Sequence, residues 1–200
     1  MMTITYEVGD SLYVNLTNKC TNNCDFCIRK LGAGAYGSDP LWLEREPTEE
    51  EAYEDIIGRD LAQYKELVFC GYGEPTERLD TLVNIAKRVK QKSSISIRIN
   101  TNGQANLIYG CDITPMLEGC IDTVSISLNE ATAEKYNAVC HPIFPNAYDA
   151  LIEFASLAKQ YVSNVVMSVV STTLSDEDIA VCAETARNAG VKFRVRQIVK

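Results

Sequence analysis

Residues 95–100 read Ile-Ser-Ile-Arg-Ile-Asn, and this alternation of aliphatic and polar side chains decides the fold class of the chain. Successive side chains of a β-strand point to opposite faces, so one face of this strand is aliphatic and the other is polar. Residues 124–129, Val-Ser-Ile-Ser-Leu-Asn, repeat the pattern. Parallel strands covered on both faces are instead nearly continuous apolar runs. We therefore expect helices on the aliphatic face alone, and a polar face that lines an interior.

Short β-rich runs alternate with helical patterns along the whole chain, which is typical of parallel strands joined by crossover helices. The expected strands cover residues 12–16, 67–70, 95–100, 123–128, 165–170 and 192–195. The expected helices run from a capping box at Thr48 and Glu51 to about Gln63, from Leu79 to Val89, from a cap at Asn146 to Tyr161, and from a cap at Ser175 to Gly190.

Six strand–helix units and a polar lining do not make a closed eight-stranded barrel, which takes about 250 residues and fills its interior with apolar side chains. The 200 residues, 46% of them apolar, suffice for one well-filled domain. We therefore expect an α/β fold, a partial (βα)6 TIM-like barrel, as a single domain over residues 1–200. Its site is expected at the C-terminal ends of the strands.

Charge and hydropathy exclude several classes of partner. The 19 basic and 27 acidic residues give a net charge of -8, which repels a nucleic-acid backbone. No apolar run approaches the roughly 18 residues of a membrane span, and the start of the chain lacks a signal-peptide pattern. We expect a cytoplasmic protein that binds neither nucleic acid nor membranes.

The segment Cys20-Thr-Asn-Asn-Cys24-Asp-Phe-Cys27 directly follows the first expected strand. Three thiolates within eight residues can converge on one centre, and iron–sulfur clusters are held by cysteine thiolates. Three ligands for a 4Fe-4S cluster leave one iron open to a small molecule. Two alternatives remain at this point: a zinc site completed by His141, the only histidine, and cysteines without a metal.

The cysteine segment, with Phe26 before its third cysteine, resembles the signature of radical S-adenosylmethionine (radical SAM) enzymes. Further motifs agree in order. Gly71-Tyr72-Gly73-Glu74-Pro75 is similar to the Gly-Gly-Glu-Pro loop of that family, residues 100–103 to its Thr-Asn-Gly motif, and residues 127–129 to its Ser-Leu-Asp motif. Within the family, the chain length, residues 41–44, Tyr136 and residues 140–142 look most like the small TatD-associated radical SAM proteins.

The resemblance implies a radical SAM core domain in which Cys20, Cys24 and Cys27 hold a 4Fe-4S cluster. The cluster would cleave S-adenosylmethionine reductively to methionine and a 5'-deoxyadenosyl radical, which abstracts hydrogen from a substrate. Phe26 would lie near the adenine, the loop of residues 71–74 would accept hydrogen bonds from the methionine ammonium group, and His141 is the nearest candidate for the methionine carboxylate. The residues expected to bind S-adenosylmethionine are Phe26, Gly71, Tyr72, Gly73, Glu74, Asn100, Asn102, Ser127, His141 and Arg196.

The implied partners are a small-molecule or protein substrate and an external one-electron donor of the flavodoxin or ferredoxin type. Arg98, Arg194 and Arg196 fall on the polar strand face, which favours an anionic group on the substrate. The alternative function is a non-catalytic iron–sulfur or zinc protein in electron transfer or structure.

Two further features concern the surroundings of the site. The segment of residues 28–47 would either close over the site or cover the open barrel edge. The remaining cysteines have spacings that do not favour a second cluster: Cys182 and Cys70 are expected in the core and on a buried strand, and Cys111, Cys120 and Cys140 lack a close pair.

Overall fold

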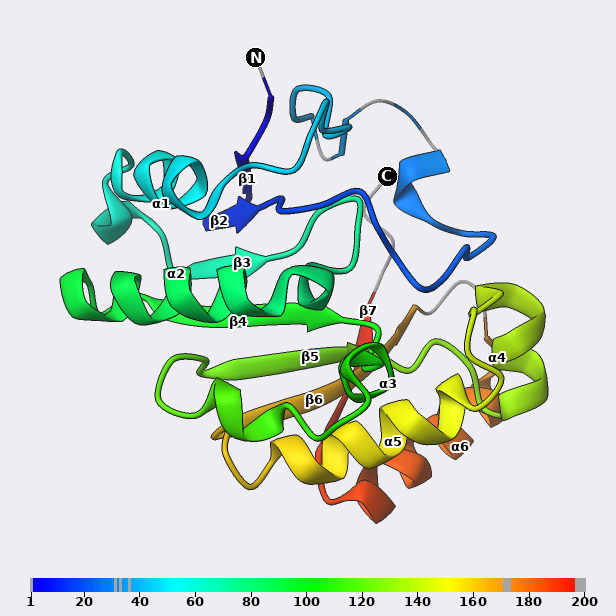
Figure 1. Cartoon of the computed structure of the whole chain (residues 1–200). Coiled ribbons are helices and arrows are strands. Elements are labelled where there is room, and N and C mark those ends of the chain that lie inside the picture. Colours follow the sequence, from blue (N-terminus) through cyan, green and yellow to red (C-terminus); the bar gives the residue numbers. More distant parts are fainter. Residues whose placement is uncertain (1, 31, 33, 36, 171–173, 197–200) are drawn as a thin grey trace.

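The computed structural model describes residues 2–30, 32, 34–35, 37–170 and 174–196 of the chain. Within these residues, the strands form one sheet whose spatial order follows the sequence (Figure 1). They are β1 (Thr5–Val8), β2 (Ser11–Val14), β3 (Glu66–Phe69), β4 (Ser96–Thr101), β5 (Thr123–Ser127), β6 (Asn164–Val170) and β7 (Lys192–Arg196). β1 is antiparallel to β2, and the strands from β2 to β7 are mutually parallel. The expected partial barrel is therefore confirmed, with one additional strand at its edge.

Helices connect the parallel strands. They are α1 (Glu49–Ile57), α2 (Leu79–Lys92), α3 (Ala105–Tyr109), α4 (Ala133–Cys140), α5 (Ala147–Ala158) and α6 (Asp176–Ala189), with short 3-10 helices at Ile28–Lys30, Leu61–Gln63, Pro75–Arg78 and Thr114–Leu117. No helix in the described part of the chain is both long enough and apolar enough to cross a membrane.

Several of the expected helix ends are confirmed and others are corrected, among them the end of α5, which is Ala158 rather than Tyr161, and that of α2, which is Lys92 rather than Val89. Thr48 caps α1 with a capping box, Ser175 caps α6 through its side chain, and Gly190 ends α6 in the left-handed conformation. α1 ends at Ile57, earlier than expected, because the chain turns into a separate 3-10 helix before Gln63. The Asn146 side chain makes no capping hydrogen bond to α5.

The two faces of the sheet differ as the alternation predicts. Register places Ile97 and Ile99 of β4 on the face that packs against the helices, and both belong to the main hydrophobic core together with residues of α1, α2, α5 and α6. Arg98 and Asn100 point to the opposite face, where β5 contributes Ser125 opposite Asn100. Burying the aliphatic face under the helices provides most of the apolar burial, and the polar face is left as the inner face of the barrel.

Strand β1 was not expected from the sequence. It forms a hairpin with β2 around Gly9, whose φ of 60° is in the left-handed region that favours glycine. Asp55 of α1 accepts hydrogen bonds from the backbone and the hydroxyl of Thr5 at 3.0 and 2.7 Å. The ring of Tyr6 lies 5.3 Å from that of Tyr13. β1 therefore covers the edge of β2.

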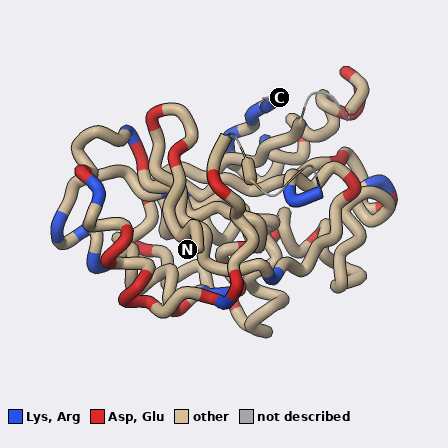
Figure 2. The backbone as a smooth tube through the Cα atoms, turned by 90° about the horizontal axis from the view of Figure 1, so that it is seen from above, with Lys and Arg blue, Asp and Glu red and all other residues tan. Residues whose placement is uncertain are grey.

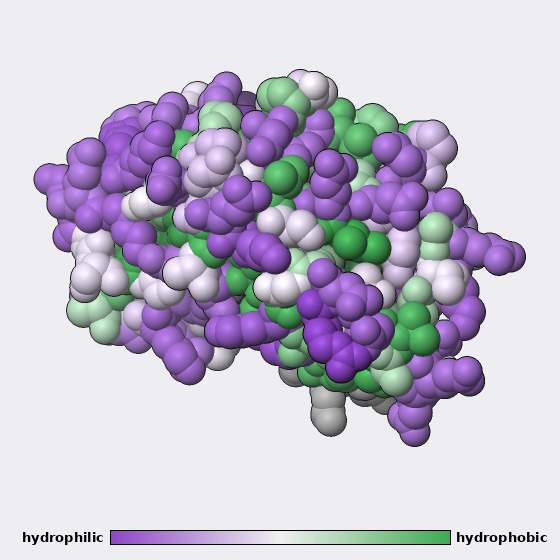
Figure 3. All heavy atoms as spheres, turned by 90° about the horizontal axis from the view of Figure 1, so that it is seen from below, coloured by the Kyte–Doolittle hydropathy of each residue, from purple (hydrophilic) through white to green (hydrophobic). Residues whose placement is uncertain are grey.

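The outer surface carries few apolar groups in contact with one another. Seen from below, the helical side of the molecule is largely hydrophilic, with small separate hydrophobic areas (Figure 3). The large hydrophobic side chains that are exposed come from separate elements: Trp42, Ile57, Tyr109, Met116, Ile143, Val181 and Val195. Scattered exposed apolar residues are normal for a folded domain, so this face indicates no docking surface.

Candidate functional site at the C-terminal ends of the strands

The cysteine segment, residues 20–27, leaves the end of β2 and runs beside α4 (Figure 1). Backbone hydrogen bonds attach it to the end of α4: Asn23 N donates to Cys140 O at 3.0 Å and Asp25 N to Val139 O at 2.9 Å. Cys20, Cys24 and Cys27 are free thiols that are only partly buried. The segment is therefore fixed along one side and leaves its thiols accessible from the other.

Buried amide side chains hold the first half of the cysteine segment. Asn22 donates to the hydroxyl of the fully buried Tyr136 at 2.9 Å, and Gln104 donates to both Asn22 Oδ1 at 2.7 Å and Tyr136 Oη at 3.1 Å. Asn102 donates to Thr21 Oγ1 at 2.7 Å. The turn after β4 and helix α4 thus hold the cysteine segment through one connected network of hydrogen bonds, in which Gln104 Oε1 is the side-chain atom left without a partner among the described residues.

The thiols of the segment have different electrostatic environments. The Cys140 thiol donates a hydrogen bond to Cys24, which lowers the pKa of Cys24 to about 7. The pKa of Cys140 is raised, first by the hydrogen bond with Cys24 and then by burial. Burial raises the pKa of Cys20 to about 12, with a further contribution from Glu74. The thiol of Cys24 is therefore more readily deprotonated at neutral pH than that of Cys20.

The geometry does not favour the alternative of a single zinc ion. Across the described residues, no group of three or more histidine, cysteine, aspartate or glutamate side chains is arranged to hold one metal ion. His141 lies at the end of α4 and its Nε2 is 3.0 Å from Asp25 Oδ1. A tetrahedral zinc site needs four such ligands around one centre. By residue type, three cysteine thiols within one short segment are the ligands of an iron–sulfur cluster.

The loop of residues 71–75 follows β3 and is packed against the chain that leads into the cysteine segment. A Cβ atom on Gly73 would lie 2.4 Å from Thr17 O and 2.5 Å from Lys19 O, and one on Gly71 would lie 2.1 Å from Asn15 Oδ1. The Glu74 N–H donates to Lys19 O at 2.7 Å. Only glycine permits this approach, so both glycines are required for the position of the loop.

Glu74 joins this loop to the end of β4. Its buried carboxylate accepts hydrogen bonds from the Asn102 backbone at 2.7 Å, from Thr101 Oγ1 at 2.7 Å and from Thr76 Oγ1 at 2.8 Å. Burial raises the pKa of Glu74, and these hydrogen bonds oppose that change. The side chain therefore holds two loops together, and the backbone of the loop is the part left to face a ligand.

Tyr72 has partners away from the strand ends. Its ring belongs to a second small hydrophobic cluster with Tyr6, Ala35 and Leu41, and its hydroxyl donates to Gly32 O at 2.8 Å. Trp42 packs edge-on against it, with 5.2 Å between ring centroids. The described part of segment 28–47 is thus packed on β1 and on the 71–75 loop, which supports its role as a cover of the barrel edge.

Two buried acceptors beside the 71–75 loop have no hydrogen-bond partner within the described residues: Asn15 Oδ1 and Asn100 Oδ1. Unpartnered buried acceptors are rare and costly, so a ligand that donates hydrogen bonds is expected here. The ammonium and hydroxyl groups of S-adenosylmethionine are such donors. With the glycine cradle and the three thiols, these acceptors make the residues present fit a 4Fe-4S cluster with S-adenosylmethionine.

The remaining expected site residues lie around these groups. Ser127 ends β5 on the inner face, Arg196 ends β7 opposite Val170, and Phe26 is partly buried against the main core. The location of Phe26 is compatible with a purely structural role as well as with contact to an adenine ring.

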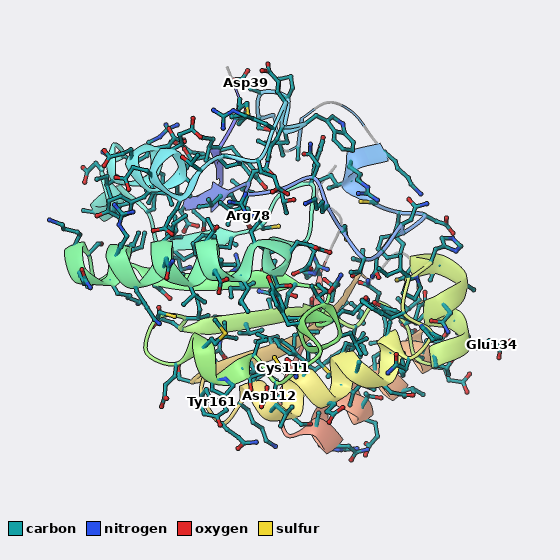
Figure 4. All side chains as sticks on the ribbon, in the orientation of Figure 1. Asp39, Arg78, Cys111, Asp112, Glu134 and Tyr161 are labelled. Atoms are coloured by element: carbon teal, nitrogen blue, oxygen red, sulfur yellow. The ribbon has the colours of Figure 1, made fainter. Side chains whose placement is uncertain are left out.

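The other cysteines do not gather into a second centre. Cys111 is exposed after α3, at a distance from the cysteine segment, as Figures 1 and 4 show. Cys120 is buried in the main core and donates to backbone carbonyls of its own 3-10 turn. Cys182 is also in the core, as expected, and Cys70 directly follows β3.

The sequence did not predict the part that three residues play in holding the cysteine segment: Asn22, Gln104 and Cys140. Asn22 and Gln104 are polar residues near motifs, and polar residues in loops are common, so the sequence gives no sign of their burial. Cys140 was considered for a second cluster, whereas the structure places its thiol against Cys24. Its position four residues after Tyr136 on a helix was the available signal.

Comparisons with known proteins agree with this site. Residues 14–186 match the family described as the Radical SAM superfamily. No curated protein sequence matches the chain significantly. Among solved structures, Streptococcus suis SuiB bound to S-adenosylmethionine is similar with a TM-score of 0.67 and 18% identity, over 94% of this chain and 40% of that chain.

Two other structures are similar at comparable levels. Methylornithine synthase (PylB) has a TM-score of 0.64 and 16% identity, over 94% of this chain and 53% of that chain. The FeFe-hydrogenase maturase HydG from Carboxydothermus hydrogenoformans has a TM-score of 0.60 and 15% identity, over 95% of this chain and 44% of that chain. The chain thus spans about half or less of each, and these likenesses show the shared fold. Because the family match extends over most of the sequence, the chain belongs to the radical SAM superfamily, whose members use a 4Fe-4S cluster and S-adenosylmethionine.

Proposed function

We propose that the chain is a radical SAM enzyme in which Cys20, Cys24 and Cys27 hold the 4Fe-4S cluster. When both are bound, the cluster supplies an electron that cleaves S-adenosylmethionine to methionine and a 5'-deoxyadenosyl radical, which abstracts hydrogen from the substrate. The observation that carries the proposal is the placement of three accessible thiols at the strand ends, beside a glycine cradle with two unpartnered acceptors.

The chain's own residues have the task of positioning and of excluding water. The network of Asn22, Gln104 and Tyr136 holds the cysteine segment in one conformation. Asn15 Oδ1 and Asn100 Oδ1 accept hydrogen bonds from the methionine ammonium group or the ribose hydroxyls of S-adenosylmethionine, which supplies the partners that they lack. The backbone of the 71–75 loop faces the same ligand, while Glu74 keeps that loop attached to β4.

The other expected contacts belong to the same proposal. Phe26 packs near the adenine, and Asn100 and Ser127 face the ribose or the methionyl end. His141 Nε2 lies 3.0 Å from Asp25 Oδ1, so the methionine carboxylate would compete with Asp25 for this histidine. A flavodoxin- or ferredoxin-type donor supplies the electron, the substrate is a small molecule or a protein, and residues 1–200 form one domain. Cytoplasmic location and the resemblance to TatD-associated proteins remain predictions.

The test is anaerobic reconstitution with iron and sulfide, followed by reduction with dithionite in the presence of S-adenosylmethionine. We expect about four iron atoms per chain and the formation of 5'-deoxyadenosine. A Cys111→Ala variant is the matched control, because Cys111 is exposed and distant from the segment, and it should behave as the wild type. A fully loaded and reduced protein that forms no 5'-deoxyadenosine would support the alternative of a non-catalytic iron–sulfur protein.

A further inference from the structure

The inner face of β7 carries two cations near the site. Register places Arg194 opposite Ser168 and Arg196 opposite Val170, so both side chains share the face that bears Arg98 and Asn100. Figure 2 shows basic segments where the chain approaches its C-terminus. The C-terminal end of β7 lies at the same end of the barrel as the cysteine segment, because the strands from β2 to β7 are parallel.

Arg98, the third arginine of this face, is already neutralised. Its Nη2 lies 2.6 Å from Glu66 Oε1, and it also donates to Tyr13 Oη at 3.4 Å. Only 11% of the Arg98 side chain is exposed. The ion pair with Glu66 neutralises the Arg98 guanidinium, although its Nε, like that of Arg196, is buried without a hydrogen-bond partner in the described part of the chain. The hypothesis of an anion site therefore narrows to the two arginines of β7, which have no carboxylate partner among the described residues.

Within the described residues, Arg194 and Arg196 have no carboxylate partner. Arg194 Nη2 donates to a neutral group, Ser125 Oγ, at 3.3 Å. Arg196 Nε is buried and has no hydrogen-bond partner in the described part of the chain. Burial of part of the Arg194 side chain, followed by the charges of Arg98 and Arg196, lowers the pKa of Arg194. Among the described residues, Glu66 is the only carboxylate that forms an ion pair with one of these three arginines, and its partner is Arg98.

Of the two cations of β7, Arg196 lies near the loop proposed for S-adenosylmethionine. The charges of Arg98 and Arg196 both act on the thiol of Cys70, which directly precedes Gly71. Asn100, whose Oδ1 has no partner, contacts the same thiol. A guanidinium donor that is buried without an acceptor destabilises the fold, so its retention here points to a ligand that supplies the acceptor.

We propose that Arg194 and Arg196 form an anion subsite that binds a carboxylate or phosphate group of the substrate; this rests on the proposed function, in which S-adenosylmethionine occupies the neighbouring strand ends. A guanidinium presents paired N–H donors in one plane, which matches two oxygen atoms of a carboxylate or phosphate. Two adjacent arginines fix both the position and the orientation of that group. The substrate would then be held next to the reacting atoms by its charged end.

The test uses the reconstituted protein with saturating S-adenosylmethionine, at constant ionic strength in chloride. Inorganic phosphate and succinate are titrated separately by calorimetry, which distinguishes a phosphate from a carboxylate site. We expect the wild type to bind at least one of them in about the millimolar range, and the Arg194→Gln/Arg196→Gln double variant to bind at least about tenfold more weakly. The Arg194→Lys/Arg196→Lys variant should fall between the two, because lysine keeps the charge and loses the paired donors.

Lys192→Gln is the matched control. Lys192 lies on the same strand and face at the opposite end of β7, where its Nζ donates to Asn164 Oδ1 at 2.7 Å. This variant should bind the anion as the wild type does. An equal loss in Lys192→Gln would indicate a general effect of charge and would overturn the subsite.

Three further results would overturn it: no binding of either anion by the wild type, equal binding by the double variant, or a tenfold loss of S-adenosylmethionine affinity in Arg196→Gln with anion binding retained. The last would assign Arg196 to the methionine carboxylate. Failure of the subsite and failure of the proposed function are separable. Anion binding by a wild type that neither binds nor cleaves S-adenosylmethionine would overturn the function alone, and intact cleavage without anion binding would overturn the subsite alone.

Discussion

The cysteine segment and the inner face of β7 lie at the same end of the barrel, yet their polar groups are satisfied to different degrees. Around residues 20–27, the amide N–H groups of Asn22, Gln104 and Asn102 donate to partners supplied by the chain itself, and of their side-chain atoms only Gln104 Oε1 lacks a partner among the described residues. On β7, Arg196 Nε has no partner and Arg194 bonds to a neutral hydroxyl. The chain itself therefore holds the cysteine segment in place, whereas β7 has donors available for a ligand.

The two regions would have different tasks: the cysteine segment holds the cluster, which radical SAM enzymes share, and β7 binds the substrate, which differs between enzymes. The part of the site that holds the cluster must keep its geometry in every turnover, and satisfied buried networks provide that rigidity. The part that selects a substrate must leave donors free for it. Variants in the first region should therefore impair cluster loading or folding, and variants in the second should change ligand binding with little effect on stability.

The largest effect is expected from the cysteines themselves. Cys20→Ala, Cys24→Ala and Cys27→Ala should each abolish stable cluster loading, because two thiolates cannot hold a cluster that uses three. Iron and sulfide content after anaerobic reconstitution measures this. Full loading of any one variant would show that the segment is not the cluster site and would remove the basis of the comparison.

The reactivity of the thiols in the cluster-free protein tests the different environments of Cys20 and Cys24. With a pKa lowered to about 7, Cys24 is about half thiolate at pH 7, whereas Cys20, with a pKa raised to about 12, is almost entirely protonated. We expect Cys24 to be alkylated by iodoacetamide at least about tenfold faster, as measured by peptide mass spectrometry. Removing the donor in Cys140→Ala should raise the pKa of Cys24 and slow its alkylation. Equal rates at Cys20 and Cys24 would contradict the proposed environments.

Glu74→Ala should lower the free energy of unfolding by about 2 to 4 kcal/mol, because it leaves the donors of Asn102, Thr101 and Thr76 without their acceptor in a buried site. Chemical denaturation measures the change. Glu77→Ala is the control: Glu77 lies on the same turn and is partly exposed, so a change within about 0.5 kcal/mol is expected. Similar losses in both variants would argue against Glu74 as the connection between the two loops.

Tyr136→Phe tests the network with a smaller change. It removes the oxygen that accepts from Asn22 and Gln104 while it keeps the ring in the core. We expect a loss of about 1 to 3 kcal/mol in unfolding free energy, together with slower cluster loading. Tyr161→Phe, at the partly exposed end of the segment after α5, should change neither quantity appreciably.

The smallest effect is expected on β7. Arg194→Gln should change the unfolding free energy by less than about 0.5 kcal/mol, because the side chain is exposed and bonds only to Ser125. Thermal or chemical denaturation of the cluster-free protein checks this. A loss as large as that of Tyr136→Phe would mean that the arginine is structural and that the two regions do not differ as described.

The fold was largely predictable because its strands alternate strictly. The sequence Ile-Ser-Ile-Arg-Ile-Asn assigns each side chain of β4 to a face, and the register confirms those faces. Strand β1 was missed because four residues at the start of a chain carry little periodic signal, and its pairing depends on the turn at Gly9. Helix α4 was missed because only Tyr136 and Cys140 of it are buried.

The residues of the site could be predicted where they form a continuous motif. They could not be predicted where the contacts join segments that are distant in the sequence. Cys20, Cys24 and Cys27 are close in sequence, so their spacing alone suggests a shared ligand. Asn22 and Gln104 meet Tyr136 only after folding, and nothing in their local sequence indicates it. The pairing of Arg98 with Glu66 was also unforeseen, because alternation gives the face of a side chain and not its partner.

The close packing of Gly73 against the backbone of Thr17 and Lys19 limits how this protein can diverge. Any side chain at position 73 would force apart the two chain segments that flank the site. The distance between these segments can therefore be kept only if residue 73 remains glycine. Gly9 has open space around its Cβ position and can exchange for asparagine at modest cost. Descendants of this sequence can therefore acquire new substrates through β7 and its surroundings, while the mouth of the barrel around the glycines remains unchanged.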